Sequence, residues 1–135
     1  MWIRIRAVII EDEPLASQYL AKLVDETCQV EVVGSATESE AGLRLCAELR
    51  PDAVFVGGGT GVPGLLSALW APLPAGGRLV ANVVTVEGEA RLFDWRARHG
   101  GSLTRIAVSR AEPAGAHQLW RPLASVTQLA AVKPA

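Results

Sequence analysis

The stretch PDAVFVGGGTG, residues 51–61, joins a short apolar run to a glycine-rich turn and decides the fold prediction. Pro51 ends the helical pattern before it, because the residue that precedes a proline avoids the helical conformation. Residues 53–56 are uninterruptedly apolar, which is typical of a strand buried on both faces of a parallel sheet. Such a strand needs crossover helices on either side, so the flanking sequence should alternate between strand and helix patterns.

Outward from residues 51–61, the sequence carries this alternation in both directions. Short apolar runs predict five further strands, at residues 5–10, 30–33, 79–84, 103–109 and 126–132. Apolar residues at helical spacing predict helices over about 14–26, 37–49, 63–70 and 86–99.

This order of segments predicts an α/β fold with one three-layer, doubly wound sheet of flavodoxin-like and Rossmann-like character. The first four crossovers imply parallel strands in the order 2-1-3-4. The last two strands have no helix between them, so we expect them to be antiparallel neighbours, which gives the order 2-1-3-4-6-5 with strand 6 antiparallel. Residues 112–123 are predicted to be a long loop between them, and Trp95 and Trp120 are expected to cover the final strand pair.

Length and composition exclude several classes of protein. A chain of 135 residues, half of them hydrophobic, suits a single domain over 1–135. A net charge of -1 gives no electrostatic footprint for nucleic acid, and no apolar run is long enough for a membrane span or a signal peptide. Two cysteines are too few for a disulfide framework. We therefore expect a soluble cytoplasmic protein without partners, apart from self-association through the edge strand 103–109.

The two halves of the chain differ in composition. Residues 1–50 hold five basic and nine acidic side chains, a net charge of -4, whereas residues 51–135 hold eight and five, a net charge of +3. Eleven of the thirteen glycines lie at or after Gly57. Each half is too short to form a sound domain alone, so this asymmetry needs an explanation other than two domains.

Residues 4–56 resemble the first half of a response-regulator receiver domain. The resemblance rests on RAVIIEDEP, on VEVVGSA, and on the helix running into LRPDAVFV. It implies that Glu11 and Asp12 correspond to the acidic pair that helps to bind magnesium. The family's phosphate-accepting Asp is replaced here by Gly57, and its last strand, which carries a Lys, is replaced by another structure.

Residues 51–134 are similar to the C-terminal half of the decarboxylating precorrin methyltransferase of cobalamin biosynthesis. PDAVFVGGG, GLLSALWAPLPAGGRLVANVVTVEGEA, HGGSLTRIAVSRAEP and WRPLASVTQLAAVKP match in order. The resemblance implies a Rossmann-like sheet that ends in an antiparallel strand pair, and an enzyme that uses S-adenosylmethionine. The family's glycine-rich cofactor turn after the first strand is replaced here by Glu11-Asp12-Glu13-Pro14.

Both resemblances share PDAVFV, so the sequence is interpreted as an engineered chimera, with a receiver-like half over 1–56 and a methyltransferase-like half over 57–135. Both parental sites are incomplete. The expectation is a scaffold that is not an enzyme, with no catalytic residue and no cofactor apart from weak Mg²⁺ binding by Glu11 and Asp12. A residual pocket is predicted at the switch point of the sheet, lined by Gly57, Gly58, Gly59, Thr60 and Thr85.

Two alternatives stay open at this point. One is a degenerate receiver-type signalling module that retains weak divalent-metal binding. The other is a residual S-adenosylmethionine-dependent precorrin methyltransferase fragment that needs a missing half.

Overall fold

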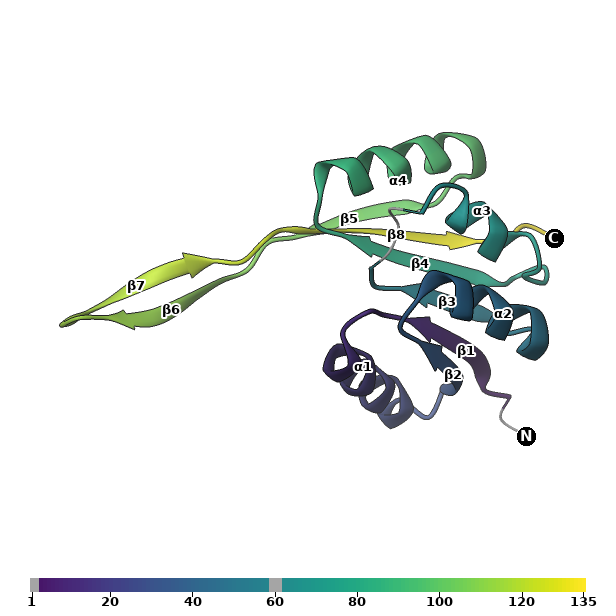
Figure 1. Cartoon of the computed structure of the whole chain (residues 1–135), viewed down its shortest axis with the longest axis horizontal. Helices are drawn as coiled ribbons and strands as arrows, with labels where there is room; N and C mark the ends of the chain where they lie inside the picture. The colour runs from purple at the N-terminus through teal and green to yellow at the C-terminus, as the bar shows by residue number, and fades with distance from the viewer. Residues whose placement is uncertain (1–2, 59–61) are drawn as a thin grey trace.

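A six-stranded sheet organises the chain in the computed structural model, which describes residues 3–58 and 62–135 (Figure 1). The strands and helices alternate up to the fourth helix, after which four strands follow one another. In chain order the elements are β1 (Ile5–Ile10), α1 (Pro14–Glu26), β2 (Val30–Ala36), α2 (Ser39–Leu49), β3 (Ala53–Val56), α3 (Leu65–Trp70), β4 (Arg78–Val83), α4 (Val86–His99), β5 (Ser102–Ile106), β6 (Ser109–Ala114), β7 (His117–Pro122) and β8 (Val126–Val132).

The strand order confirms the predicted topology. The sheet runs β2-β1-β3-β4-β8-β5, with β1, β2, β3 and β4 parallel and β8 antiparallel to both β4 and β5. The strand predicted as the sixth is therefore β8, which inserts between β4 and β5. β3 lies between β1 and β4, so the segment that both family resemblances share is a central strand of the sheet.

The helices are divided unequally between the two faces of the sheet. Right-handed crossovers place α2, α3 and α4 on one face and α1 alone on the other, and Figure 1 shows α1 set apart from the other three helices. Burial follows this division: Leu79, Ala81 and Val83 of β4 are buried, whereas Val80 and Asn82 between them are only partly buried. The third layer is thus a single helix. Among the described residues, no helix is long and apolar enough to traverse a membrane.

One hydrophobic core joins the two halves of the sequence. It lies under α2, α3 and α4 and takes Val8, Ile10, Val54 and Val56 from β1 and β3, together with Leu79 and Leu129 from β4 and β8. Trp70 and Trp95 pack edge to face within it, with ring centroids 5.0 Å apart. Trp95 therefore belongs to the core, in the same cluster as Leu129 and Ala131 of β8. Such interdigitated packing makes the chain one structural unit.

The predicted loop over 112–123 is wrong, because most of this segment forms a β-hairpin. β6 and β7 pair antiparallel from Ser109↔Pro122 to Ala114↔His117, and the two-residue turn between them has Gly115 at a φ of 62°. Positive φ at this position suits the tight turns that connect hairpin strands. Figure 1 shows this hairpin, which we call the arm (residues 109–122), projecting away from the body of the molecule.

Candidate functional site

The ends of three parallel strands meet at the acidic turn after β1. The Gly57 amide donates to the Ile10 carbonyl at 2.8 Å, and the Glu11 amide donates to the Ala36 carbonyl at 2.9 Å. These bonds hold the turn against the carboxyl ends of β3 and β2. The structure thus brings Glu11, Asp12, Gly57 and Gly58 together at the switch point of the sheet.

The two carboxylates of the turn occupy the space beside the glycines. A Cβ atom built on Gly57 would overlap the Glu11 carboxylate, and one built on Gly58 would lie 3.0 Å from Oδ1 of Asp12. Partial burial raises the pKa of Glu11, and the neighbouring Asp12 carboxylate raises it further. Gly59 and Thr60, which were predicted to line the same pocket, lie outside the described residues.

Two backbone donors at the start of α1 are already used by the chain's own carboxylates. Oε1 of Glu11 accepts from the Glu13 amide at 3.2 Å, and Oε1 of Glu13 accepts from the Leu15 amide at 3.1 Å. A cofactor that carries a carboxylate, as S-adenosylmethionine does, would need such donors free at a glycine-rich turn. This acidic turn does not fit that group.

The turn also offers only part of a metal site. Glu11 and Asp12 supply carboxylate oxygens, but Gly57 stands where a receiver has its third carboxylate. Within residues 3–58 and 62–135, no group of three or more His, Cys, Asp or Glu side chains could hold a metal ion. Hard divalent cations need six or more oxygen ligands, so water would have to supply most of them.

A second cluster lies at the base of the arm, and sequence analysis missed it. The Thr127 hydroxyl of β8 donates to Oε2 of Glu89 on α4 at 2.5 Å, and a terminal nitrogen of Arg105 on β5 reaches the same oxygen at 2.5 Å. Nε of Arg105 also donates to the Thr127 hydroxyl at 3.3 Å. The three residues are 16 to 38 positions apart in the sequence, so no local motif signals the cluster.

These contacts fix the charges in the cluster. The hydrogen bond from Thr127 and the bond from Arg105 lower the pKa of Glu89, so this carboxylate is ionised over the neutral range. Thr127 is buried, whereas 59% of the Arg105 side chain is exposed. Glu89 therefore orients the guanidinium of Arg105, and the remaining N–H groups of Arg105 stay accessible to a ligand.

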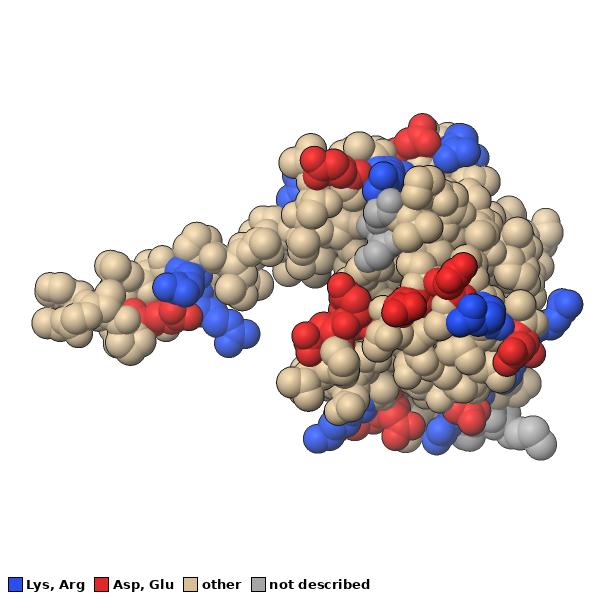
Figure 2. All heavy atoms as spheres, viewed as in Figure 1, with Lys and Arg blue, Asp and Glu red and all other residues tan. Residues whose placement is uncertain are grey.

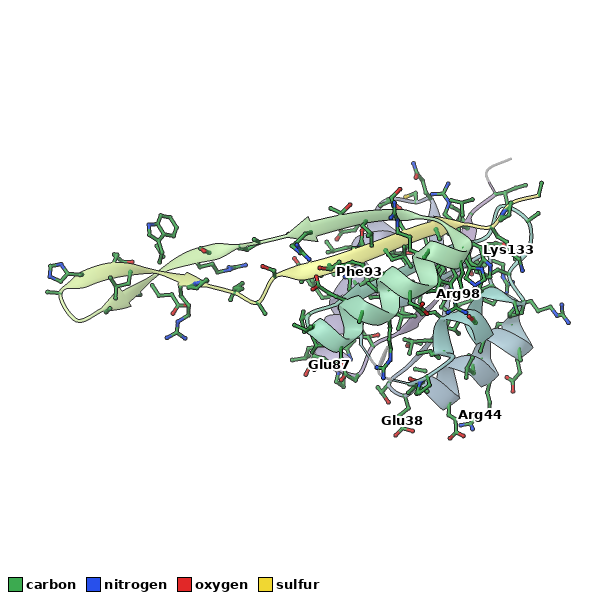
Figure 3. The ribbon with its side chains drawn as sticks, turned by 90° about the horizontal axis from the view of Figure 1, so that it is seen from above. Glu38, Arg44, Glu87, Phe93, Arg98 and Lys133 are labelled. Carbon is green, nitrogen blue, oxygen red and sulfur yellow. The ribbon has the colours of Figure 1, made fainter. Side chains whose placement is uncertain are left out.

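A cavity of about 440 Å³ opens beside this cluster, between the start of α4 and the base of the arm. Figure 3 shows α4 lying along the sheet, with Glu87 at the end nearer the arm and Arg98 toward the other end. Thr85, predicted to line the residual pocket, lines this cavity and caps α4 by accepting from the Gly88 amide at 2.9 Å. The lining residues are Val84, Thr85, Val86, Glu89, Arg105, Ala124 and Ser125.

Known proteins similar to the chain fall into two groups. A family model described as the precorrin methyltransferase domain matches residues 2–133. A precorrin-6Y C(5,15)-methyltransferase (decarboxylating) of Sinorhizobium sp is 42% identical over 91% of this chain, which spans 29% of that relative's length. An uncharacterized response regulatory protein of Vibrio parahaemolyticus is 52% identical over 50 residues, which are 37% of this chain and 21% of that protein.

A solved structure extends the first similarity to three dimensions. The crystal structure of a domain from a Corynebacterium diphtheriae protein described as a putative precorrin-6Y C5,15-methyltransferase has a TM-score of 0.66 and 32% identity. The match covers 95% of this chain and 75% of that one.

These similarities support both resemblances inferred from the sequence and correct one expectation. Because both parental sites are incomplete, the sequence predicts a scaffold that is not an enzyme. That expectation is wrong, because the family model that matches the chain is a precorrin methyltransferase domain, and the Sinorhizobium relative is a methyltransferase.

Proposed function

The chain belongs to the precorrin methyltransferase domain family, and from this premise we propose that it is the substrate-side part of a precorrin-modifying enzyme. In this proposal a carboxylate-bearing tetrapyrrole binds in the cavity between α4 and the base of the arm. The observation that carries the proposal is the exposed Arg105 guanidinium, which Glu89 and Thr127 orient toward that cavity. A substrate that a relative decarboxylates must carry a carboxylate, and arginine is the side chain best suited to bind one.

The proposal assigns no role to S-adenosylmethionine in this chain. Two donors at the start of α1 are occupied, and three carboxylates in a row would repel the carboxylate of the cofactor. The chain's own residues bind and orient the tetrapyrrole: Arg105 by charge, and Thr85 and Ser125 by their hydroxyl groups at the cavity wall. The chain spans less than a third of the Sinorhizobium relative, so methyl transfer would need a cofactor-binding part supplied elsewhere.

Titration with uroporphyrin, a carboxylate-rich tetrapyrrole, tests the substrate proposal through the shift of its Soret absorption band. We expect Arg105→Ala to weaken binding about tenfold or more, in line with a lost charge-assisted hydrogen bond. Arg98→Ala is the matched control, because Arg98 is 60% exposed and forms a comparable ion pair with Asp94 on the same helix. Equal affinity of the two variants would refute the site.

We also propose that the chain arose by engineered recombination within residues 51–57. The central position of β3 supports this, because the strand that both resemblances share lies between β1 of the receiver-like half and β4 of the methyltransferase-like half. The absence of a complete parental site also favours a designed junction over a natural fusion.

A receiver-type function is the second candidate, supported by the carboxylates of Glu11 and Asp12 that lie against Gly57 and Gly58. Weak Mg²⁺ binding is expected at this turn. Gly57→Asp would add a third carboxylate, and its Cβ would require the flexible end of Glu11 and the edge of the Phe55 ring to shift. Calorimetric titration should show tighter Mg²⁺ binding by Gly57→Asp than by Gly57→Asn, and an unchanged affinity would dismiss the candidate.

A further inference from the structure

A second cavity lies at the other edge of the sheet from Arg105 and the proposed tetrapyrrole site. It has a volume of about 510 Å³ and opens between α1 and α2, beside the edge strand β2. Small-molecule sites in proteins typically measure about 300–1,000 Å³. The polar side chains that line this cavity are those of Ser17, Gln18, Ser35, Thr37, Arg44 and Glu48.

Ser17 on α1 contributes a buried hydroxyl group without a partner. Only 8% of this residue is exposed, yet its side chain forms no hydrogen bond with any other described residue. Buried polar groups in proteins are normally hydrogen-bonded, and leaving one unpaired costs stability. Because Ser17 lines the cavity, a polar atom of a ligand bound there can supply the missing partner.

The edge of β2 adds backbone groups to the same lining. The Ala36 carbonyl accepts from the Glu11 amide at 2.9 Å and is therefore turned toward β1. Successive residues of a parallel strand direct their N–H and C=O groups to opposite sides, so those of Ser35 point to the open edge. Within the described part of the chain, no strand pairs with β2 on that side. One donor and one acceptor of the backbone are thus available to a ligand.

Arg44 and Glu48 bring opposite charges to the cavity from α2. They are four residues apart, which places them side by side on one face of the helix. Neither side chain forms an ion pair or a hydrogen bond with the other or with any other described residue. Figure 2 shows basic surface set among acidic surface over α2. A purely anionic ligand would be repelled by these carboxylates, whereas a ligand with one charge of each sign would find a partner for both.

We propose that this cavity binds a zwitterion of the amino-acid type, either a free amino acid or a short peptide with both ends charged. Arg44 pairs with the carboxylate of the ligand, and Glu48 pairs with its ammonium group. The Ser17 hydroxyl and the backbone groups of Ser35 bind polar atoms of the ligand. This site is independent of the proposed tetrapyrrole site, because no residue lines both cavities.

Isothermal titration of the full chain with alanine and with trialanine tests the proposal and distinguishes the two ligand sources. At least one of them should bind saturably, with a Kd below about 1 mM. Blocking either charge of that ligand, by N-acetylation or by amidation of its carboxylate, should weaken binding about tenfold or more. Saturating uroporphyrin should leave the affinity unchanged. Absence of binding by both probes, or equal affinity for the blocked and unblocked forms, would overturn the proposal.

Charge-removing variants assign each end of the ligand. Arg44→Gln should weaken binding about tenfold or more, and amidation of the ligand should then cause no further loss, because both changes remove the same ion pair. Glu48→Gln should respond in the same way to N-acetylation. Lys22→Gln is the matched control, because Lys22 is exposed on α1 and lies outside the cavity. An equal loss of affinity in Lys22→Gln and Arg44→Gln would refute the assignment.

Ser17→Ala separates ligand binding from folding. Because the Ser17 hydroxyl has no partner among the described residues, its removal should not lower the melting temperature of the unliganded protein. The same variant should bind the ligand about threefold more weakly or worse, in line with one lost hydrogen bond. A lower melting temperature with unchanged ligand affinity would show that the hydroxyl serves the fold and would contradict its place in the site.

Discussion

The Thr127 hydroxyl donates a 2.5 Å hydrogen bond to the Glu89 carboxylate, and this bond ties α4 to β8 at the base of the arm. The same carboxylate oxygen accepts from Arg105 of β5, so one side chain of α4 holds the two strands that lead into the arm. The proposed tetrapyrrole site depends on this connection, because it sets the direction of the Arg105 guanidinium.

The first prediction concerns the pH dependence of this connection. Because the pKa of Glu89 is lowered by folding, its contribution to stability is complete above the ordinary carboxyl pKa of 4.5 and is lost as pH falls through the lower, folded value. Thr127→Val should lower the melting temperature at pH 7, and this difference should shrink in acid. Thermal melts from about pH 7 to pH 3 measure it, with exposed Thr104→Val as the control. A deficit that stays constant with pH would contradict the role of Glu89.

The second prediction concerns Glu11, whose pKa is shifted in the direction opposite to that of Glu89. Burial raises the pKa of Glu11, so the stability cost of its ionised form grows as pH rises above the ordinary carboxyl pKa of 4.5 and is complete above the folded pKa. The cost is absent where Glu11 is protonated in both states. Glu11→Gln keeps the acceptor for the Glu13 amide and removes the charge, so it should raise the melting temperature at pH 7. The exposed Glu26→Gln should change it little. A lower melting temperature for Glu11→Gln would show that its charge is stabilising.

The third prediction separates the two thiols. Cys28 is exposed, whereas burial raises the pKa of Cys46 to about 11. Thiolate is the reactive form, so a thiol reagent should modify one cysteine in the native protein at pH 8 and the second only on unfolding. Mass spectrometry of the labelled peptides identifies the site. Rapid labelling of Cys46 in the native protein would contradict the burial of this thiol between α2 and the sheet.

The fourth prediction tests whether the two halves share one core. Ile10 and Leu79 are both buried in that core, one from each half of the sequence. Ile10→Ala and Leu79→Ala should each destabilise the same unfolding transition by about 2–5 kcal/mol. Urea unfolding followed by fluorescence and by circular dichroism should give coincident curves. Separate transitions for the two halves would contradict a single domain over 1–135.

Much of the fold could be predicted because the chain signals it locally. The strands β1 and β3 are continuous apolar runs, Pro14 starts α1, and Thr85 caps α4 as its sequence position indicates. The absence of a helix between the last two strands of the sheet also predicted that they are antiparallel. These features depend on residues close together in the sequence.

Other features depended on contacts that sequence patterns do not carry. Leu15, Tyr19 and Leu23 fit a helical stripe, yet they are exposed, because the face of the sheet beyond α1 has no further helix. The sequence predicts a loop in place of the arm, because Pro113, Gly115 and Pro122 interrupt the strand pattern. The Glu89–Arg105–Thr127 cluster could not be foreseen, since β8 reaches its place between β4 and β5 only in the folded sheet.

The central claim is that this chain retains the substrate side of a precorrin methyltransferase domain and has lost the cofactor side at the turn after β1. Isothermal titration of one protein sample with uroporphyrin and, separately, with S-adenosylmethionine tests it most directly. We predict saturable heat with uroporphyrin and no binding of S-adenosylmethionine at micromolar strength. Micromolar binding of S-adenosylmethionine, without any of uroporphyrin, would contradict the claim.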